Sequence, residues 1–228
     1  MEILGQIKSS FIDYPGKICT VLFTGGCNFR CGYCHNPDIV NRTVRTLDQN
    51  EILKFLDKRK KYLDGVCISG GEPTLQKELY EFIQEIKSLG YLVKLDTNGT
   101  RPEVISRLLE GKMLDYIAMD VKGPLHKYQQ IVEISVDTEI IKESIQLLIN
   151  ADIDYEFRTT IHKEILREED LLQIAKLIQN AKRYSIQNIK ISGPLLNKEN
   201  TYTAFSKDEL DRIENDLKTY VKELNVRY

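Results

Sequence analysis

Short runs of apolar and β-branched residues recur along the chain, and each is followed by a longer amphipathic segment. The runs are too continuously apolar for strands with one face in solvent, so they indicate strands buried on both faces, as in a parallel sheet. The predicted strands are Ile18–Phe23, Val66–Ser69, Leu92–Asp96, Tyr116–Val121, Tyr155–Thr160 and Ile189–Ser192.

The segments between these runs carry apolar residues at helical spacing. In one of them, Leu79, Phe82, Ile83 and Ile86 fall on one face of a helix that is predicted to end near Gly90. The other predicted helices are Leu47–Tyr62, Pro102–Gly111, Thr138–Ile149, Glu168–Tyr184 and Lys207–Val226.

Strands that alternate with helices predict βαβ units with right-handed crossovers. Units of roughly 30 residues would use most of the 228 residues after six repeats, whereas a full eight-unit barrel typically needs about 250 residues. We therefore predict an α/β fold, a partial (β/α)6 TIM-like barrel, although a flat doubly wound sheet would give the same alternation. No internal repeat or long linker interrupts the sequence, so residues 1–228 are predicted to form a single domain.

Composition and charge narrow the classes of partner. The formal net charge is −2, from 32 basic and 34 acidic side chains, which gives no support for a nucleic acid or an anionic membrane as a partner. The sequence also bears on where the protein is located, because no run approaches the ~20 consecutive apolar residues of a membrane-spanning helix. Residues Met1–Ser10 lack the apolar core of a secretory signal. A cytoplasmic location is expected.

Three of the five cysteines, Cys27, Cys31 and Cys34, fall in the loop after the first predicted strand. In a cytoplasmic chain such crowding points to a metal site rather than to disulfides. Thiolates are soft ligands that suit iron–sulfur clusters, zinc or copper(I). A four-iron cluster held by three cysteines leaves one iron open for a further ligand. The spacing favours such an open cluster.

A structural zinc site completed by His35, Cys19 or Cys67 is the alternative interpretation. Zinc sites usually pair two CxxC-like segments, and the sequence lacks a second one. Cys19 and Cys67 lie in apolar runs, which is typical of small buried residues.

The CxxxCxYC arrangement of Cys27, Cys31, Tyr33 and Cys34 resembles the signature of the radical S-adenosylmethionine (SAM) superfamily. The resemblance implies that the three cysteines bind a four-iron four-sulfur (4Fe-4S) cluster. It also implies that Tyr33 lies against the adenine of SAM.

A second segment, Ser69–Thr74 at the end of the second predicted strand, is similar to the Gly-Gly-Glu turn of the same family. The resemblance implies that Gly70, Gly71 and Glu72 meet the amino group of the methionine part of SAM. Glycines expose backbone carbonyls, and a carboxylate complements an ammonium. Two widely separated matches, each at the end of a predicted strand, are a far more specific sign of the family than one match alone.

Two further strand ends, Leu95–Gly99 and Met119–Lys122, resemble the SAM-binding segments of glycyl-radical-enzyme activating enzymes, specifically the anaerobic ribonucleoside-triphosphate reductase activating protein group. The implied SAM-binding residues are Asp96, Asn98, Lys122 and Arg158. The implied ligands of a monovalent cation beside SAM are Asp96, Thr97 and Asp120.

Arg158 stands inside an apolar strand and needs an acidic partner or a ligand, because an unpaired buried arginine is costly. Asp13 lies in a segment that, by resemblance, faces the glycyl loop of a protein substrate. The resemblance weakens after Thr160, since Ile191–Leu195 lacks a histidine that some relatives carry there. No role is assigned to His126 or His162.

The resemblance implies that the cluster cleaves SAM reductively to a 5′-deoxyadenosyl radical, which abstracts a hydrogen atom from a glycine of a partner glycyl radical enzyme. A minimal core suits a macromolecular substrate whose own loop fills the cavity, and the resemblance implies an anaerobic ribonucleoside-triphosphate reductase as that partner. A flavodoxin or ferredoxin-like protein is the expected electron donor. One alternative is a radical SAM enzyme acting on a small molecule such as a deazapurine precursor, and another is a non-catalytic zinc-binding protein.

Overall fold

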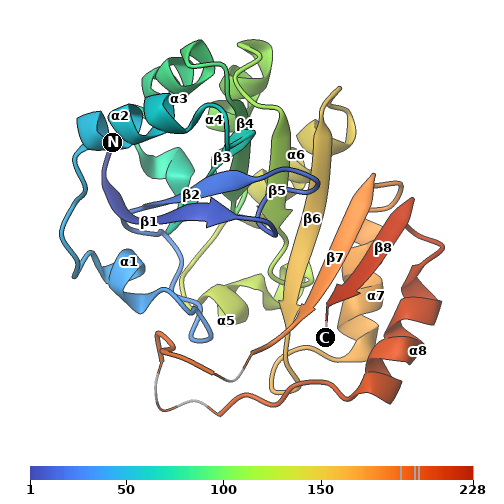
Figure 1. The fold of residues 1–228 in the computed structure, drawn as a ribbon. Coiled ribbons are helices and arrows are strands. Elements are labelled where there is room, and N and C mark those ends of the chain that lie inside the picture. Colours follow the sequence, from blue (N-terminus) through green and yellow to red (C-terminus); the bar gives the residue numbers. More distant parts are fainter. Residues whose placement is uncertain (191, 198, 200, 228) are drawn as a thin grey trace. The chain divides into compact units, whose positions relative to one another are not determined.

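A computed structural model describes residues 1–190, 192–197, 199 and 201–227 (Figure 1). The described residues include eight strands, which follow one another in chain order from β1 to β8. The chain forms two compact units. The first comprises residues 1–28, 36–97 and 103–117, and the second comprises residues 29–35, 98–102 and 118–228.

The first unit contains four complete strands. They are β1 (Ile3–Ser10), β2 (Cys19–Thr24), β3 (Gly65–Gly70) and β4 (Leu92–Thr97). β1 runs antiparallel to β2, whereas β2, β3 and β4 are parallel. The helices are α1 (Pro37–Asn41), α2 (Gln49–Arg59), the short 3-10 helix η1 (Pro73–Leu75), α3 (Leu79–Ser88) and α4 (Pro102–Glu110), whose first residue belongs to the second unit.

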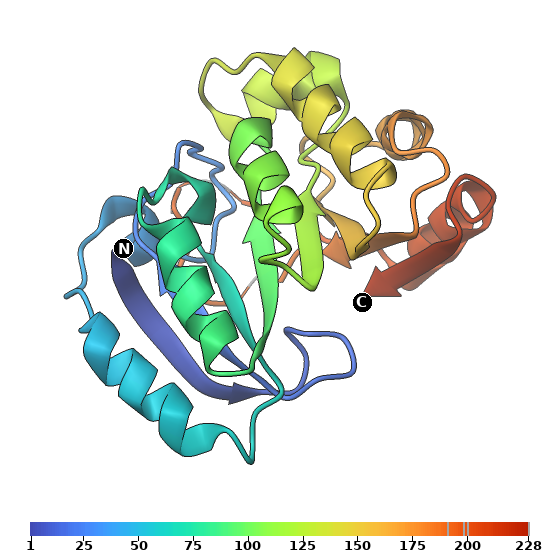
Figure 2. The same cartoon turned by 90° about the horizontal axis from the view of Figure 1, so that it is seen from above.

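The helices of this unit form where the sequence places caps and apolar faces. The carboxylate of Asp48 accepts the N–H of Asn50 at 2.8 Å and so begins α2. The expected apolar face of α3 is buried. Figure 2 shows α3 and α4 lying along one face of the strands. Burial of this face drives α3 onto the sheet.

The second unit continues the strand–helix alternation. β5 (Tyr116–Asp120) starts in the first unit and ends in the second. The remaining strands β6 (Asp154–Ile161), β7 (Arg183–Asn188) and β8 (Glu223–Arg227) pair in parallel. The helices are η2 (Leu125–Lys127), α5 (Tyr128–Val132), α6 (Thr138–Ile149), α7 (Glu168–Leu177) and α8 (Lys207–Leu217). α7 packs beside α8, and α8 packs against β8 (Figure 1).

Two predicted helices were too long. The helix predicted over Glu168–Tyr184 ends at Leu177, and residues 183–188 form β7 instead. Asn180 adopts a left-handed backbone (φ 68°) that stops the helical path. The helix predicted over Lys207–Val226 ends at Leu217, and its last residues form the edge strand β8. A five-residue edge strand carries too weak an apolar pattern to be separated from a preceding amphipathic helix.

The predicted strand Ile189–Ser192 was wrong. Residues 189, 190 and 192 lie outside any strand, and Ile191 lies outside the described residues. Its place in the sheet is taken by β7, where Tyr184 pairs with Phe157. β1 was not anticipated. The alternation of strands and helices confirms the α/β class, and the single-domain expectation stays a prediction.

None of the helices in the described part of the chain combines the length and the apolar character needed to cross a membrane.

Candidate active site

The cysteine loop follows β2 directly. None of its three cysteines is in a disulfide; Cys27, in the first unit, and Cys34 are half-buried, and Cys31 is buried. In the second unit, the N–H of Cys34 donates to the carbonyl of Cys31 at 3.0 Å and closes a tight turn. This turn is held from one side by Glu133, whose carboxylate accepts the N–H of Gly32 at 3.1 Å.

A second support for this loop comes from residues 196–197. The N–H of Leu196 donates to the carbonyl of Cys34 at 2.9 Å, and the N–H of Asn197 donates to that of Gly32 at 3.0 Å. Sequence reasoning missed this contact, because nothing in a polar segment some 160 residues downstream indicates where its backbone donors point. The turn bearing Cys31 and Cys34 is thus fixed by backbone hydrogen bonds.

The donor chemistry of the loop fits an iron–sulfur cluster. Burial raises the pKa of the Cys31 thiol above its usual value, and the positive charge of Lys122 counteracts part of that rise. A nearby cation favours the thiolate, which is the form that ligates iron. Within the described ranges, no three His, Cys, Asp or Glu side chains form a ready-made site for a single metal ion. The fit therefore rests on three cysteines in one loop, none of them in a disulfide.

The Gly-Gly-Glu turn packs on the start of the cysteine loop within the first unit. The N–H of Glu72 donates to the carbonyl of Gly26 at 2.8 Å, and the N–H of Gly71 donates to that of Thr24 at 2.9 Å. Gly70 adopts φ +114°, a backbone conformation that is unfavourable for residues with a Cβ atom. The fold thus brings together two motifs that lie some 45 residues apart in the sequence.

Gly71→Ala is expected to destabilise the protein by about 1–3 kcal/mol through overpacking. A Cβ at Gly71 would lie 1.9 Å from the carbonyl oxygen of Gly26, which is backbone and cannot rotate away. Urea unfolding measures the loss. Gly5→Ala is the matched control, since its Cβ would meet nothing closer than 3.4 Å and should change stability by less than about 0.5 kcal/mol. Equal losses in the two variants would contradict the tight contact.

Glu72 is almost fully buried, with 1% of its surface exposed. Its Oε1 accepts hydrogen bonds from the hydroxyl of Thr97 at 2.7 Å, the hydroxyl of Thr74 at 2.5 Å and the N–H of Thr74 at 3.0 Å. The structure therefore brings two predicted site residues, Glu72 and Thr97, into direct contact.

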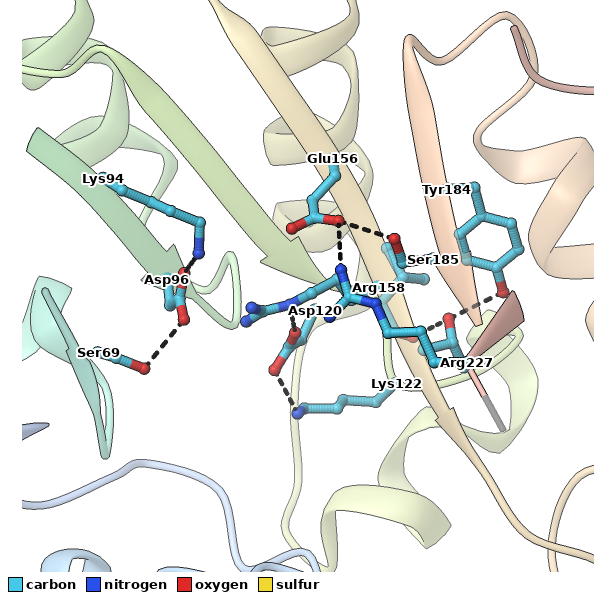
Figure 3. A network of polar contacts seen from close by, with 12 residues as sticks. Ser69, Lys94, Asp96, Asp120, Lys122, Glu156, Arg158, Tyr184, Ser185 and Arg227 are labelled. Carbon is cyan, nitrogen blue, oxygen red and sulfur yellow. Dashed lines mark hydrogen bonds and ion pairs between the residues drawn. The ribbon is translucent and has the colours of Figure 1, made fainter. Parts of the chain in front are cut away.

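Asp96 is held by two donors of the first unit (Figure 3). Its Oδ1 pairs with the ammonium of Lys94, and its Oδ2 accepts the hydroxyl of Ser69 at 3.1 Å. Lys94 was not singled out in the sequence, although a lysine in an otherwise apolar strand, two residues before an aspartate, was a readable signal. Side chains at i and i+2 share a face of a strand, which puts the two charges together.

Asp120 binds two cations of the second unit (Figure 3). Its Oδ1 accepts the Nε of Arg158 at 2.8 Å, and its Oδ2 accepts the Nζ of Lys122 at 2.9 Å. Burial alone would raise the pKa of Asp120, but Arg158 and Lys122 together hold it well below its usual range. The acidic partner expected for Arg158 is therefore Asp120.

Asn98 forms a local turn rather than projecting a free amide. Its Oδ1 accepts the N–H of Thr100 at 3.1 Å and the hydroxyl of Thr100 at 2.7 Å. The next residue, Gly99, has φ +75°, and its carbonyl accepts the hydroxyl of Ser144 on α6 at 2.6 Å. These bonds fix the segment after β4.

Tyr33 belongs to an aromatic cluster in the second unit. Its ring centroid lies 5.3 Å from that of His162 and 6.3 Å from that of Tyr202. These three residues line a cavity of about 200 Å³. The Nδ1 of His162 pairs with Glu164 at 3.1 Å, while burial lowers the pKa of His162. The hydroxyl of Tyr33 and the Nε2 of His162 are buried without a hydrogen-bond partner among the described residues. Sequence reasoning gave His162 no role.

Asp13 lies in the loop between β1 and β2. Its carboxylate accepts the hydroxyl of Ser10 at 2.5 Å. The neighbouring side chains Phe11 and Ile12 are 74% and 83% exposed. The loop therefore presents apolar side chains to solvent beside Asp13.

Comparisons with known proteins identify the family. The family model described as Radical SAM superfamily matches residues 21–178. A Methanocaldococcus jannaschii protein provisionally named a glycyl-radical enzyme activating enzyme is 39% identical over 193 residues, which cover 82% of this chain and 80% of that protein. The pyruvate formate-lyase-activating enzyme of Clostridium pasteurianum is 38% identical over 130 residues, 53% of each chain.

Among solved structures, Streptococcus suis SuiB superposes with a TM-score of 0.71 at 13% sequence identity. The match covers 91% of this chain and 48% of SuiB, so it spans about half the length of SuiB, and the match to the clostridial enzyme likewise spans about half of that protein. This likeness supports the fold and is consistent with the expected partial barrel.

The chain therefore belongs to the radical SAM superfamily and, within it, to the glycyl-radical-enzyme activating enzymes. This confirms the family and the enzyme class that the cysteine and glycine motifs predicted. Membership implies a 4Fe-4S cluster and SAM as cofactors. The roles of the individual site residues stay predictions.

Proposed function

We propose that this protein installs a glycyl radical on a partner enzyme, with a 4Fe-4S cluster bound by Cys27, Cys31 and Cys34. When bound, the cluster and SAM supply the reductive cleavage that yields a 5′-deoxyadenosyl radical, and the hydrogen atom comes from a glycine of the partner. The single observation that carries this proposal is the Glu72–Gly26 hydrogen bond, which joins the Gly-Gly-Glu turn to the cysteine loop.

The residues proposed to bind SAM carry charges that suit a zwitterionic ligand. The backbone of Gly70 and Gly71 and the carboxylate of Glu72 would bind the methionine ammonium, because a carboxylate and carbonyl oxygens accept its hydrogen bonds. Lys122 and Arg158 would bind the methionine carboxylate, with Asp120 holding both cations in place. Asp96 and Asn98 would contact SAM from the end of β4.

The aromatic cluster suits the adenine. Tyr33 would lie against the base, and a buried ring excludes water from the site.

We propose an anaerobic ribonucleoside-triphosphate reductase as the partner and a flavodoxin or ferredoxin-like protein as the electron donor, in the cytoplasm, without nucleic acid or a membrane. The β1–β2 loop supports a protein substrate, since Phe11 and Ile12 are exposed beside Asp13. Exposed apolar side chains that cluster at a loop tip are typical of contact surfaces.

The test is electron paramagnetic resonance of the purified reductase after anaerobic incubation with the reconstituted protein, SAM and reductant. A glycyl-type doublet that requires all components is expected. A silent spectrum combined with SAM turnover stimulated by a small metabolite would instead favour the small-molecule enzyme. One zinc with no iron or acid-labile sulfide would favour the zinc-binding protein.

A further inference from the structure

Lys94 is an unusual residue for the interior of a parallel strand. It is 1% exposed and lies in β4 of the first unit. Its ammonium pairs with Asp96, lies 3.8 Å from the sulfur of Cys67 and lies 5.8 Å from the ring centroid of Tyr116. A buried ammonium is tolerated only with a compensating charge, and here Asp96 supplies it.

The structure does not fit a monovalent cation at the residues that the resemblance implies. Both oxygens of Asp96 accept donors of the first unit, Lys94 and Ser69. Both oxygens of Asp120 accept donors of the second unit, Arg158 and Lys122. Each carboxylate charge is therefore already compensated by a cation of this chain, and each carboxylate oxygen already accepts an N–H or O–H donor, which removes the electrostatic reason for an added metal cation.

The third implied cation ligand, Thr97, also has a hydrogen-bond partner. Its hydroxyl donates to Glu72 at 2.7 Å. The side chains of all three implied ligands therefore already hold side-chain partners from this chain.

We propose that the Lys94 ammonium takes the place of the monovalent cation at Asp96. An ammonium group and a potassium ion carry the same charge and are close in size, so one can substitute for the other beside a carboxylate. Lys94 is then a positioning residue, which fixes the carboxylate of Asp96 at the end of β4. SAM binding should consequently need neither potassium nor sodium.

Thermal unfolding of the full chain without cofactors gives the first test. The wild-type Tm is expected to be the same in potassium, sodium and tetramethylammonium chloride at equal ionic strength. Lys94→Met removes the charge at nearly constant volume and leaves Asp96 as an acceptor. Its Tm should fall in tetramethylammonium and recover by about 2–4 °C in potassium, because a cation that binds only the folded state stabilises it.

Lys87→Met is the matched control for this experiment. Lys87 also pairs with an aspartate of the first unit, Asp115, at 2.7 Å, but near the surface. Its variant should melt at one temperature in all three salts. If Lys94→Met does not fold, Lys94→Gln serves as the second neutral variant. A wild-type Tm that rises specifically with potassium or sodium would overturn the inference, as would a folded neutral variant that no small cation rescues.

The second test uses SAM binding and rests on the proposed function. Equilibrium dialysis with the reconstituted protein should give a wild-type Kd that is independent of the salt cation. The Lys94→Met variant should bind about tenfold more weakly in tetramethylammonium than in potassium. Wild-type protein that binds no SAM would count against the proposed function, while the melting curves would still decide the role of Lys94. Wild-type binding that requires potassium would contradict the inference alone.

Discussion

Cys31→Ala is expected to abolish 5′-deoxyadenosine formation from SAM and to lower iron incorporation sharply. Cys31 lies in a turn whose backbone is held by hydrogen bonds from Cys34, Leu196 and Gly32, so the position of its thiol in the loop is fixed. A cluster left with two cysteines of the loop loses one of the three ligands that anchor it. Anaerobic reconstitution followed by iron and sulfide analysis and chromatography of the products measures both effects.

Cys19→Ala provides the control for this substitution. Cys19 is fully buried in β2, and burial together with the negative charge of Asp13 raises the pKa of its thiol to about 12. Such a thiol is a poor ligand because it keeps its proton. Iron content and product should stay close to wild type. Undiminished product in Cys31→Ala would remove Cys31 from the ligand set, and loss of product in both variants would point to misfolding.

Asp120→Asn is expected to lower the free energy of unfolding by about 2–3 kcal/mol, less than for a fully buried ion pair because the group is partly exposed. Asparagine keeps the shape of aspartate, so packing changes little. The guanidinium of Arg158 and the ammonium of Lys122 lose the negative charge that compensates both of them. Urea unfolding at neutral pH measures the change.

A double variant separates charge from other causes. Arg158→Met in the Asp120→Asn background removes one of the two cations whose compensation is lost, so the double variant should lose less stability than the sum of the single variants. Asp115→Asn is the comparison for a site with one cation, since Lys87 is the one cation paired with Asp115 among the residues that the structure describes. Additive losses in the double variant would contradict a shared electrostatic origin.

Local patterns along the chain were enough to predict the class of fold and to single out the three thiols of the cysteine loop as candidate ligands. Thiol spacing is a local property, because a loop of eight residues can direct its side chains at one centre whatever surrounds it. The apolar face of α3 and the Gly-Gly-Glu turn after β3 are equally local, since helical spacing and glycine backbone freedom act within a few residues. These features carried the family prediction.

The ends of helices and strands in the last third of the chain were harder to predict from the sequence. The pattern around Tyr184 could be continued as a helix, and only pairing with β6 makes it a strand. Strand formation depends on a partner that lies far away in the sequence, so periodicity alone cannot place it.

The pairing of the charged residues, in contrast, depends on the three-dimensional fold. Arg158 needed an acidic partner, but the sequence could not choose Asp120 from 34 acidic residues. Likewise, the contacts of Lys94 with Asp96 and of Thr97 with Glu72 arise from side-chain directions on β4 and the neighbouring turn. Pairing between buried charges depends on distances of a few ångströms across strands, because the interaction falls with separation and burial removes the screening of water. Spacing along the chain does not encode those distances, and the fold supplies them.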